Sequence, residues 1–586
     1  MAHYTDLSST LVSLVADRLK SYGELPALTF QKKSMSYSEL SRKIDQAAAG
    51  FQNLGVERGE AVGLFLPNTP FFPVAFHGAL KTGAAVSAIN SLFEPEQIKH
   101  QIKDSNIRTL VTMDSSLMLP KVMEIMNDND TPLEQVIVGK TTEILPFFKS
   151  LAVKLLNPGS ITTKIPKDER ITLFSDFLNN AGAPDKIDVS PDDIAVLQYT
   201  GGTTGGKPKA AMLTHNNIAS NILQGLAILP EFEDKQERML GALPLFHIFG
   251  NAMMNLGLHK GAEIYLHPKA TDVEDVSRLI HSSKATFMAG TPGLYEKLIP
   301  AARKNGHDYS RLKMAISGGD ALPMTTAKAF ADVAACGIRS GYGMSESPVI
   351  CVMPKGAEYE RGLAGRILPG TDVRITDPES GKTLDPEDAG EITIKGPQLM
   401  RGYFNQDDVN ARVFTQDGYF KTGDLGKVIV DENGEKSLYI TGRLKNVIIR
   451  GGHNIYPEDI DGIEAHGDVA ETCTFGVPAQ GAHGEYVATL IRLKDGNQAD
   501  AQTTASILGH IADQVGRFDR PNFIAFVDDI PKTKIMKLDR NEALRRVKDQ
   551  ELFLYKADYK THRLKKDIYH LPSQEGPDID PFPSPG

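Results

Sequence analysis

Short apolar runs alternate with helical spacing along the first part of the chain. Residues 8–55 have a mainly helical pattern with one extended patch at 28–30, whereas 61–66 and 84–89 are short and almost wholly apolar. Short runs without polar alternation are typical of strands buried on both faces. Their alternation with helices predicts an α/β fold, with layers built on largely parallel sheets.

Three further segments mark the ends of predicted strands. A strand over 194–199 leads directly into a glycine-rich segment, after which Thr214 is placed to cap a helix that runs to about Ile228. The segments 317–319 and 341–343 both follow apolar stretches and contain two glycines each. We therefore expect tight turns at both places.

The pattern changes in the last third of the chain. From about 370 to 445 it consists of short strands separated by Gly, Asp and Asn, which predicts a small antiparallel, barrel-like part. Residues 446–546 return to a mixed pattern, typical of a small α+β domain. The expected organisation is therefore a large N-terminal domain at 1–444, a small domain at 445–547 and an extension at 548–586. The extension ends in a proline-rich, acidic stretch and is expected to be partly disordered.

The composition is that of an ordinary globular chain. It has 586 residues, of which 41% are hydrophobic and 24% charged, so several domain-sized units are expected. The net charge of −10, without a long run of Lys and Arg, argues against a nucleic-acid binder. The three cysteines, Cys336, Cys351 and Cys473, are far apart and form no CxxC motif. This pattern argues against a disulfide framework and fits a reducing compartment.

The sequence predicts a cytoplasmic protein. The N-terminus has no basic region followed by an apolar core, and no apolar run reaches the roughly 18 residues that span a bilayer. Residues 144–168 mix apolar pairs with four lysines. They are interpreted either as a helix and loop packed on the large domain or as an amphipathic element at the inner face of a membrane. The sequence also leaves room for a homodimer.

The segment best suited to chemistry is 199–209, which holds four glycines, three threonines and two lysines. Glycine lets backbone amides approach a polyphosphate, threonine supplies hydroxyl donors and lysine supplies positive charge. The run 201–207 matches GxxxxGK, but Pro208 follows where a P-loop needs Ser or Thr and a continuing helix. A different kind of nucleotide loop is therefore favoured over a P-loop and over a plain glycine-rich turn.

Five other segments carry weaker signals that gain meaning from their order. A single histidine in an apolar run, such as His247, is most often a core residue, and many β-turns end in an acid such as Asp424. The five segments are 243–250, 341–346, 419–424, 442–452 and 531–537. Together with the glycine loop, they make the chain resemble the adenylate-forming superfamily of acyl-CoA synthetases, luciferases and peptide-synthetase adenylation domains over about 8–547.

This resemblance implies a reaction in two steps. A carboxylate first reacts with ATP, with Mg2+ as cofactor, to give acyl-AMP and pyrophosphate. The acyl group then passes to the thiol of coenzyme A. The large domain would bind AMP, and the small domain would carry the catalytic lysine and rotate about a hinge at Lys445. The implied partners are a fatty acid, ATP and coenzyme A.

The resemblance also implies roles for individual residues. The residues implied to bind ATP or AMP are Thr200, Gly201, Gly202, Thr203, Thr204, Gly205, Lys209, Gly319, Tyr342, Gly343, Ser345, Asp424 and Arg443. The implied catalytic residues are Lys537, His247, Thr204 and Glu346, of which Thr204 and Glu346 would hold the metal. The acyl pocket would comprise His247, Phe249, Met253 and Gly341, with Met254 nearby. Gly451 and Gly452 would face coenzyme A.

The chain departs from the superfamily pattern at three positions. Gly206 is an additional glycine, Ala210 replaces a glycine, and Met536 precedes Lys537 where glycine is usual. None of these changes removes a charged group, so an active enzyme is expected. The run 197–205 looks most like bacterial fatty acid–CoA ligases, which favours a medium- or long-chain fatty acid. The alternatives are an aryl-acid ligase of the 4-coumarate type, a fatty acyl-AMP ligase that serves a carrier protein, and an inactive acyl-nucleotide-binding module.

Overall fold

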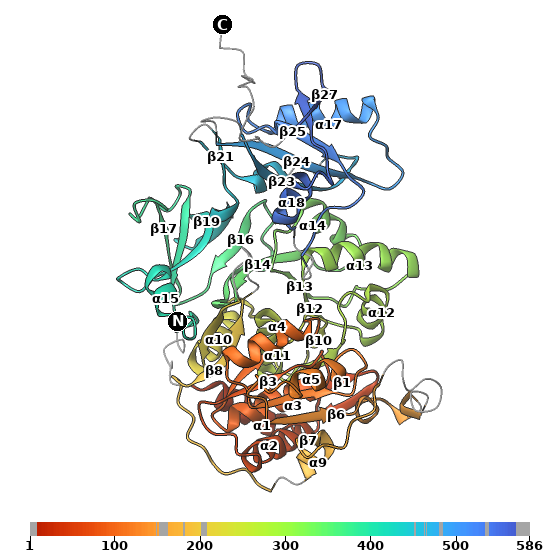
Figure 1. Cartoon of the computed structure of the whole chain (residues 1–586), viewed down its shortest axis with the longest axis vertical. Coiled ribbons are helices and arrows are strands. Elements are labelled where there is room, and N and C mark those ends of the chain that lie inside the picture. The colour runs from red at the N-terminus through yellow and green to blue at the C-terminus, as the bar shows by residue number, and fades with distance from the viewer. Residues whose placement is uncertain are drawn as a thin grey trace.

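The chain folds into α/β layers with a smaller C-terminal part at one end (Figure 1). The computed structural model describes residues 9–147, 149–151, 162–179, 182–200, 208–450, 453–461, 463, 466–479, 484–533 and 538–569. In this part of the chain, no helix is both long and apolar enough to cross a bilayer.

The first sheet of the large domain has seven strands among the described residues. Its order is β7 (Ile171–Leu173), β6 (Gln135–Gly139), β5 (Thr109–Met113), β3 (Ala61–Leu64), β4 (Ala85–Ala88), β8 (Ile194–Tyr199) and β9 (Ala210–Thr214). All neighbouring pairs are parallel except β8 and β9, which form an antiparallel pair on either side of the glycine loop. The strands β3, β4 and β5 are buried at every position, and the apolar runs at 61–66 and 84–89 predict this for β3 and β4.

The second sheet has thirteen strands in the described part of the chain. Its order is β17 (Asp372–Thr376), β18 (Gly390–Lys395), β19 (Phe420–Val430), β20 (Lys436–Arg443), β16 (Leu363–Ile367), β15 (Ser347–Val352), β14 (Ile338–Met344), β13 (Met314–Ser317), β12 (Phe287–Gly290), β10 (Arg238–Gly241), β11 (Glu263–Leu266), β1 (Pro26–Phe30) and β2 (Lys33–Ser36). Strand β14 is the junction, because it pairs in parallel with β13 and antiparallel with β15. The predicted change from parallel to antiparallel sheet is thus confirmed, but it begins at β14 and β15, before the predicted start near residue 370.

Helices of the large domain lie between the two sheets and around them. They are α1 (Leu11–Tyr22), α2 (Tyr37–Asn53), α3 (Phe71–Lys81), α4 (Pro95–Asp104), α5 (Leu119–Met126), α6 (Thr141–Ile144), α9 (Phe174–Asn179), α10 (His215–Ile228), α11 (Ile248–Lys260), α12 (Val273–Ser283), α13 (Pro292–Asn305), α14 (Met324–Ala331) and α15 (Asp407–Val413). Helix α3 contacts the first sheet and α11 the second, while α1 packs against both helices. These helices therefore bridge the two sheets.

Helix α10 begins where the sequence predicts. The side chain of Thr214 accepts a hydrogen bond from the Asn217 amide, and the Asn217 side chain accepts one from the Thr214 amide. This reciprocal capping satisfies two amides that a helix leaves unpaired at its start. The helix ends at Ile228, also as predicted.

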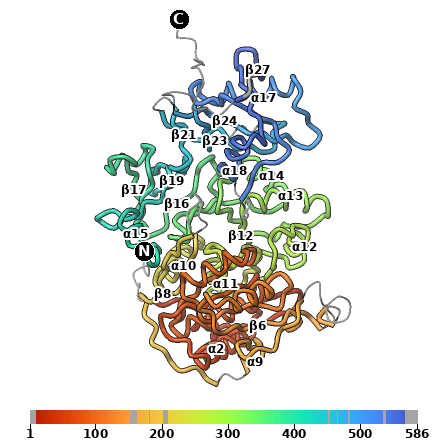
Figure 2. Tube along the Cα trace, in the orientation of Figure 1, coloured from red at the N-terminus to blue at the C-terminus, as the bar shows by residue number. Residues whose placement is uncertain are grey.

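The C-terminal part begins after a single turn of 3-10 helix, η1 (Leu444–Asn446). Its elements are β21 (Ile448–Arg450), β22 (His453–Ile455), α16 (Pro457–Asp461), β23 (Val469–Pro478), β24 (Glu485–Leu493), α17 (Ala501–Gln514), β25 (Phe523–Phe526), α18 (Arg540–Lys548), β26 (Tyr555–Asp558) and β27 (Arg563–Ile568). Strands β23 to β27 form one sheet in that order. Figure 2 shows this blue part next to β16, β19 and α14.

Two expectations differ from the structure. Residues 341–343 lie within β14 and do not form a turn after it, because they continue into an antiparallel pairing with β15. The sheet of the C-terminal part also extends past residue 547, since β26 pairs with β25 and β27 with β26. Most of the proline-rich tail, 570–586, lies outside the described residues, as do 152–161 within the 144–168 segment.

Candidate active site

A cavity opens between α10, α11 and the ends of β13, β14 and β15. The space, including its opening to solvent, is about 690 Å3. Its lining residues are Asn221, Ile222, Gly225, Leu229, His247, Ile248, Phe249, Ala252, Met253, Leu256, Ile316, Gly318, Gly319, Gly341, Tyr342, Gly343, Met344, Pro348, Val349 and Val352. We call it the α10–α11 cavity. Its size and largely apolar lining are those of a small-molecule site.

The α10–α11 cavity gathers residues that the sequence assigned to two different ligands. His247, Phe249, Met253 and Gly341, predicted for the acyl pocket, line the same space as Gly319, Tyr342 and Gly343, predicted for the nucleotide. Met254, also expected here, is instead buried in the core, because the next position of α11 points away from Met253. His247 caps α11, with Nδ1 accepting a hydrogen bond from the Phe249 amide at 3.3 Å.

A polar row stands beside this cavity. The Tyr342 hydroxyl donates a hydrogen bond to Asp424 Oδ2 at 2.7 Å, and Arg443 Nε lies 3.1 Å from Asp424 Oδ1. Burial, together with the adjacent Asp424 carboxylate, raises the pKa of Tyr342, so its phenol stays protonated and keeps donating. The Asp424 carboxylate likewise raises the pKa of Arg443. Antiparallel pairing places Asp424 directly opposite Arg443 on β19 and β20.

A second cluster surrounds Glu346, just past the end of β14. The Tyr403 hydroxyl donates a hydrogen bond to Glu346 Oε1 at 2.5 Å, and Lys209 Nζ lies 4.7 Å from the centre of the Tyr403 ring. Burial raises the pKa of Glu346, while the Tyr403 hydrogen bond and the positive charge of Lys209 act in the opposite direction. Tyr403 therefore joins the lysine after the glycine loop to the predicted metal-binding carboxylate.

The sequence pattern predicts no role for Tyr403, because contacts between distant segments bring this residue to the site. The segment 400–404 is held against β9 because the Met212 amide donates to the Gly402 carbonyl and the Phe404 amide donates to the Ala210 carbonyl. The Met400 amide also donates to the Glu346 carbonyl at 2.8 Å. No motif or spacing in the sequence singles out this tyrosine, so only the tertiary contacts place it near Glu346.

Hydrogen bonds hold the two residues that flank the glycine loop, Thr200 and Lys209, and the end of β8 before them. The Thr200 amide donates to the Lys209 carbonyl at 2.9 Å, which closes the loop. One residue earlier, the Tyr199 hydroxyl donates to Asp104 Oδ2 at 2.6 Å, which fixes the end of β8 to α4. The loop itself, 201–207, lies outside the described residues.

Several other predicted residues also lie outside the described part of the chain. They are Gly201, Gly202, Thr203, Thr204, Gly205, Gly206, Gly451, Gly452, Met536 and Lys537. Ser345 is partly exposed, one position before Glu346. Lys445 is exposed within η1, the single turn that connects β20 to β21. The roles of these positions stay predictions from the sequence.

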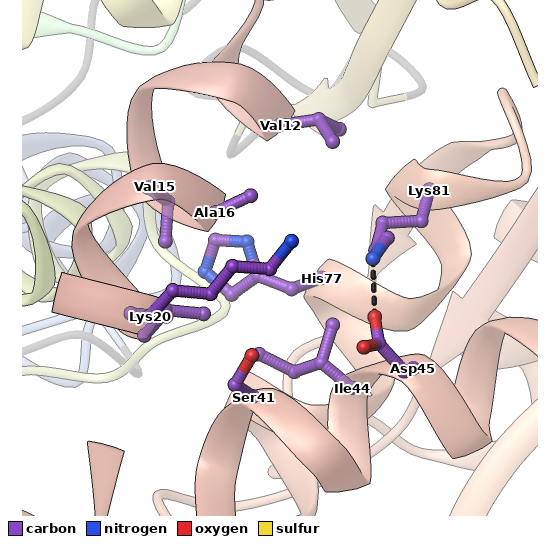
Figure 3. Close-up of a pocket in the computed structure, with 10 residues that line it drawn as sticks. Val12, Val15, Ala16, Lys20, Ser41, Ile44, Asp45, His77 and Lys81 are labelled. Carbon is purple, nitrogen blue, oxygen red and sulfur yellow. Dashed lines mark hydrogen bonds and ion pairs between the residues drawn. The ribbon is translucent and has the colours of Figure 1, made fainter. Parts of the chain in front are cut away.

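A smaller cavity lies between α1, α2 and α3 (Figure 3). Lys81 forms an ion pair with Asp45 at its edge, and His77 lines it from α3. Burial lowers the pKa of His77 to about 3, so this histidine is neutral at ordinary pH. None of the residues that the sequence predicts for the site lines this cavity, whereas several of them line the α10–α11 cavity.

Comparisons with known proteins agree with this geometry. Residues 15–404 match the family described as AMP-binding enzyme, and residues 462–537 match the AMP-binding enzyme C-terminal domain. A long-chain-fatty-acid–CoA ligase of Bacillus subtilis (strain 168) is 31% identical over 544 residues, covering 92% of this chain and 94% of the relative. The 4-coumarate–CoA ligase 1 of Arabidopsis thaliana is 28% identical, covering 86% and 87%.

The fold is also similar to that of solved structures. The crystal structure of ATP-bound MatB from Rhodopseudomonas palustris aligns with a TM-score of 0.77 at 26% identity. That alignment covers 92% of this chain and 100% of the other.

Proposed function

The chain belongs to the AMP-binding enzyme family, and we propose that it activates a medium- or long-chain fatty acid. As an adenylate-forming CoA ligase it uses ATP and coenzyme A as substrates. In the proposed reaction, the fatty carboxylate attacks the α-phosphorus of ATP to give acyl-AMP and pyrophosphate. The coenzyme A thiol then displaces AMP and forms the acyl-CoA thioester.

The observation that carries the proposal is the shared α10–α11 cavity. Apolar side chains of α10 and α11, such as Ile222 and Met253, form one part of its lining, whereas Gly319 and Tyr342 form another. When the hydrocarbon part of an acid lies among the apolar side chains of α10 and α11, its carboxylate lies next to Gly319 and Tyr342. Such proximity supports an in-line attack on bound ATP, because fixed geometry removes much of the entropic barrier. Relatives named long-chain-fatty-acid–CoA ligase support the same substrate class.

The proposed roles are those that the superfamily resemblance implies for these residues. Tyr342 would stack on adenine, and Asp424, held by Arg443, would accept hydrogen bonds from the ribose hydroxyls. Lys209 and the glycine loop would bind the phosphates. Lys537 would bridge the acyl carboxylate and the α-phosphate, where positive charge stabilises the transition state most.

The residues present fit a magnesium ion. Mg2+ in nucleotide sites is bound by one or two carboxylates together with substrate phosphates and water. Glu346 offers a carboxylate whose partner Tyr403 also contacts Lys209. The described residues contain no cluster of three or more His, Cys, Asp or Glu side chains that could hold a metal by themselves. The proposal therefore assigns Mg2+ to Glu346 and Thr204, where the ion would screen the phosphate charge from the attacking carboxylate.

A panel of acids tests the proposal. The purified chain is incubated with ATP, Mg2+ and each acid, with and without coenzyme A, and both AMP release and thioester formation are followed. Coenzyme A-dependent turnover of fatty acids supports the proposal. Preference for 4-coumarate and related acids indicates an aryl-acid ligase, and acyl-AMP without thioester indicates an acyl-AMP ligase. No turnover with any acid indicates an inactive binding module.

A further inference from the structure

The α10–α11 cavity has a definite deep end. Its lining residues follow α10 from Asn221 to Leu229, just past the end of the helix, and follow α11 from His247 to Leu256. The interval from His247 to Leu256 corresponds to about 13 Å of helical rise. The cavity therefore runs along the two helices, from the nucleotide residues beside His247 towards Leu229 and Leu256.

Two charged residues lie immediately beyond this end. On β14 the lining residues begin at Gly341, and Arg339 is the preceding residue that points to the same face of the sheet. Arg339 also lies directly opposite the lining residue Ile316 in the parallel pairing of β13 and β14. Glu231 follows Leu229 by two positions. Arg339 Nη2 and Glu231 Oε1 form an ion pair at this place.

This ion pair is set in apolar surroundings. The side chain of Arg339 is 9% exposed and that of Glu231 is 14% exposed. Phe232, the next residue, is buried and packs edge-on against Phe287 at 5.2 Å between ring centres. Arg339 Nη1 is buried and has no hydrogen-bond partner among the described residues. A buried ion pair is a poor source of stability compared with apolar packing, so its presence here calls for a functional reason.

We propose that the Arg339–Glu231 ion pair is the floor of the α10–α11 cavity and limits the substrate to medium-chain acids. This inference rests on the proposed activation of fatty acids and defines the chain length. A terminal methyl group that reaches the floor meets two buried charges, and a longer chain has to separate them or displace the strand that carries Arg339. Both are unfavourable, because a separated charge stays buried without its partner. About 13 Å accommodates an extended chain of roughly ten carbons.

Two measurements test this floor. The first compares kcat/KM of the unchanged enzyme for saturated acids from hexanoate to stearate, and the expected result is a maximum near decanoate with a steep loss towards palmitate. The second uses the double variant Glu231→Leu with Arg339→Leu, which removes both charges together and opens space behind Leu229. Its ratio of kcat/KM for palmitate to that for decanoate is expected to rise on the order of tenfold or more.

A matched control removes another ion pair of an arginine and an acid, which does not line the cavity. Arg303 and Asp332 lie 3.0 Å apart at the surface, and the double variant Arg303→Leu with Asp332→Leu is expected to keep the original ratio. Equal use of palmitate and decanoate by the unchanged enzyme overturns the inference, even if the double variant does not fold. An unchanged ratio in a folded Glu231→Leu, Arg339→Leu enzyme also overturns it. Failure of the unchanged enzyme to use any fatty acid overturns instead the proposed function.

Discussion

The hydroxyl of Tyr403 donates a hydrogen bond to Glu346 Oε1 at 2.5 Å, and this contact joins two segments 57 residues apart. It holds the carboxylate proposed for Mg2+ in one orientation, while the Tyr403 ring lies against the ammonium of Lys209. We therefore predict that Tyr403 is a positioning residue, which holds the carboxylate proposed for Mg2+ next to Lys209.

The variant Tyr403→Phe is expected to slow adenylation on the order of 10–100-fold, since a hydrogen bond to a charged group contributes about 1.5–3 kcal/mol. The rate is measured as acid-dependent exchange between ATP and pyrophosphate over a range of Mg2+ concentrations. A positioning role also predicts a higher Mg2+ requirement. The control Tyr439→Phe removes a phenol that donates to Glu360 Oε2 at 3.2 Å on the surface, and it should leave the exchange unchanged. An identical Mg2+ profile for Tyr403→Phe and the unchanged enzyme would contradict this role.

The carboxylate of Asp424 is expected to contribute to the binding of ATP and not to the binding of the acid. Asp424→Asn weakens the pairing with Arg443 and leaves no charged acceptor for ribose, so KM for ATP should rise on the order of 10–100-fold. KM for the acid should change little. Asp417→Asn, which removes a surface partner of Arg374 at 2.6 Å, provides the matched control. A larger increase in KM for the acid than in KM for ATP would contradict a role of Asp424 in binding ribose.

Two glycines of β14 should respond differently to the same substitution. A Cβ at Gly343 would lie 2.0 Å from the Pro348 carbonyl oxygen, whereas a Cβ at Gly341 would have its nearest neighbour, Ile316 Cγ2, at 3.4 Å. Gly343→Ala should therefore destabilise the large domain by about 1–3 kcal/mol, as overpacking does. Gly341→Ala should stay close to the unchanged protein. Thermal unfolding of both variants checks this, and equal Tm values would show that β14 and β15 can separate more easily than the structure indicates.

Lys537 is expected to act in only one of the two half-reactions. Lys537→Ala should reduce the carboxylate-dependent exchange of ATP and pyrophosphate on the order of 100–1000-fold, because a charge-stabilising donor is lost. Thioester formation from supplied acyl-AMP should be retained. Lys548→Ala, on α18, is the control for removing a lysine from the same domain. Equal loss of both half-reactions would argue that Lys537 supports the structure rather than adenylation.

Two buried histidines make the fold sensitive to acid. Burial lowers the pKa of His77 to about 3, with His215 and Lys81 adding to the shift, and burial lowers that of His215 to about 4, opposed by Asp193. Below the ordinary value of 6.5 the unfolded chain binds protons that the folded chain does not. The free energy of unfolding should therefore fall by about 1.4 kcal/mol per pH unit for each histidine, from pH 6.5 down towards pH 4.

Urea unfolding between pH 7 and pH 5 measures this slope. The variant His77→Asn should have a shallower slope than the unchanged protein, whereas His562→Asn, at an exposed position, should keep it. The expectation is contradicted if the free energy of unfolding of His77→Asn depends more steeply on pH than that of the unchanged protein. It is also contradicted if the slope becomes equally shallow in both variants.

The sequence was sufficient for those parts of the fold and site that depend on local pattern. The apolar runs predict β3 and β4, Thr214 predicts the start of α10, and turn residues predict the antiparallel strands after 370. These features follow from neighbouring residues, since periodicity, capping and turn preference act over a few positions. Residues 341–343 were wrongly predicted as a turn, because the segment continues into the pairing with β15, to which Gly343 allows a close approach.

The tertiary structure alone decided which distant residues share one space. No spacing along the chain indicates that Tyr403 reaches Glu346, or that Arg339 meets Glu231 beyond Leu229, because sheet order and helix packing determine both contacts. The sequence by itself determined the chemical groups: the glycine loop, Glu346, Asp424 and Lys537. The structure decided how Glu346 and Asp424 are held by their neighbours, and how far the α10–α11 cavity extends. The physical reason is that burial and charge pairing depend on packing between segments that the linear pattern does not relate.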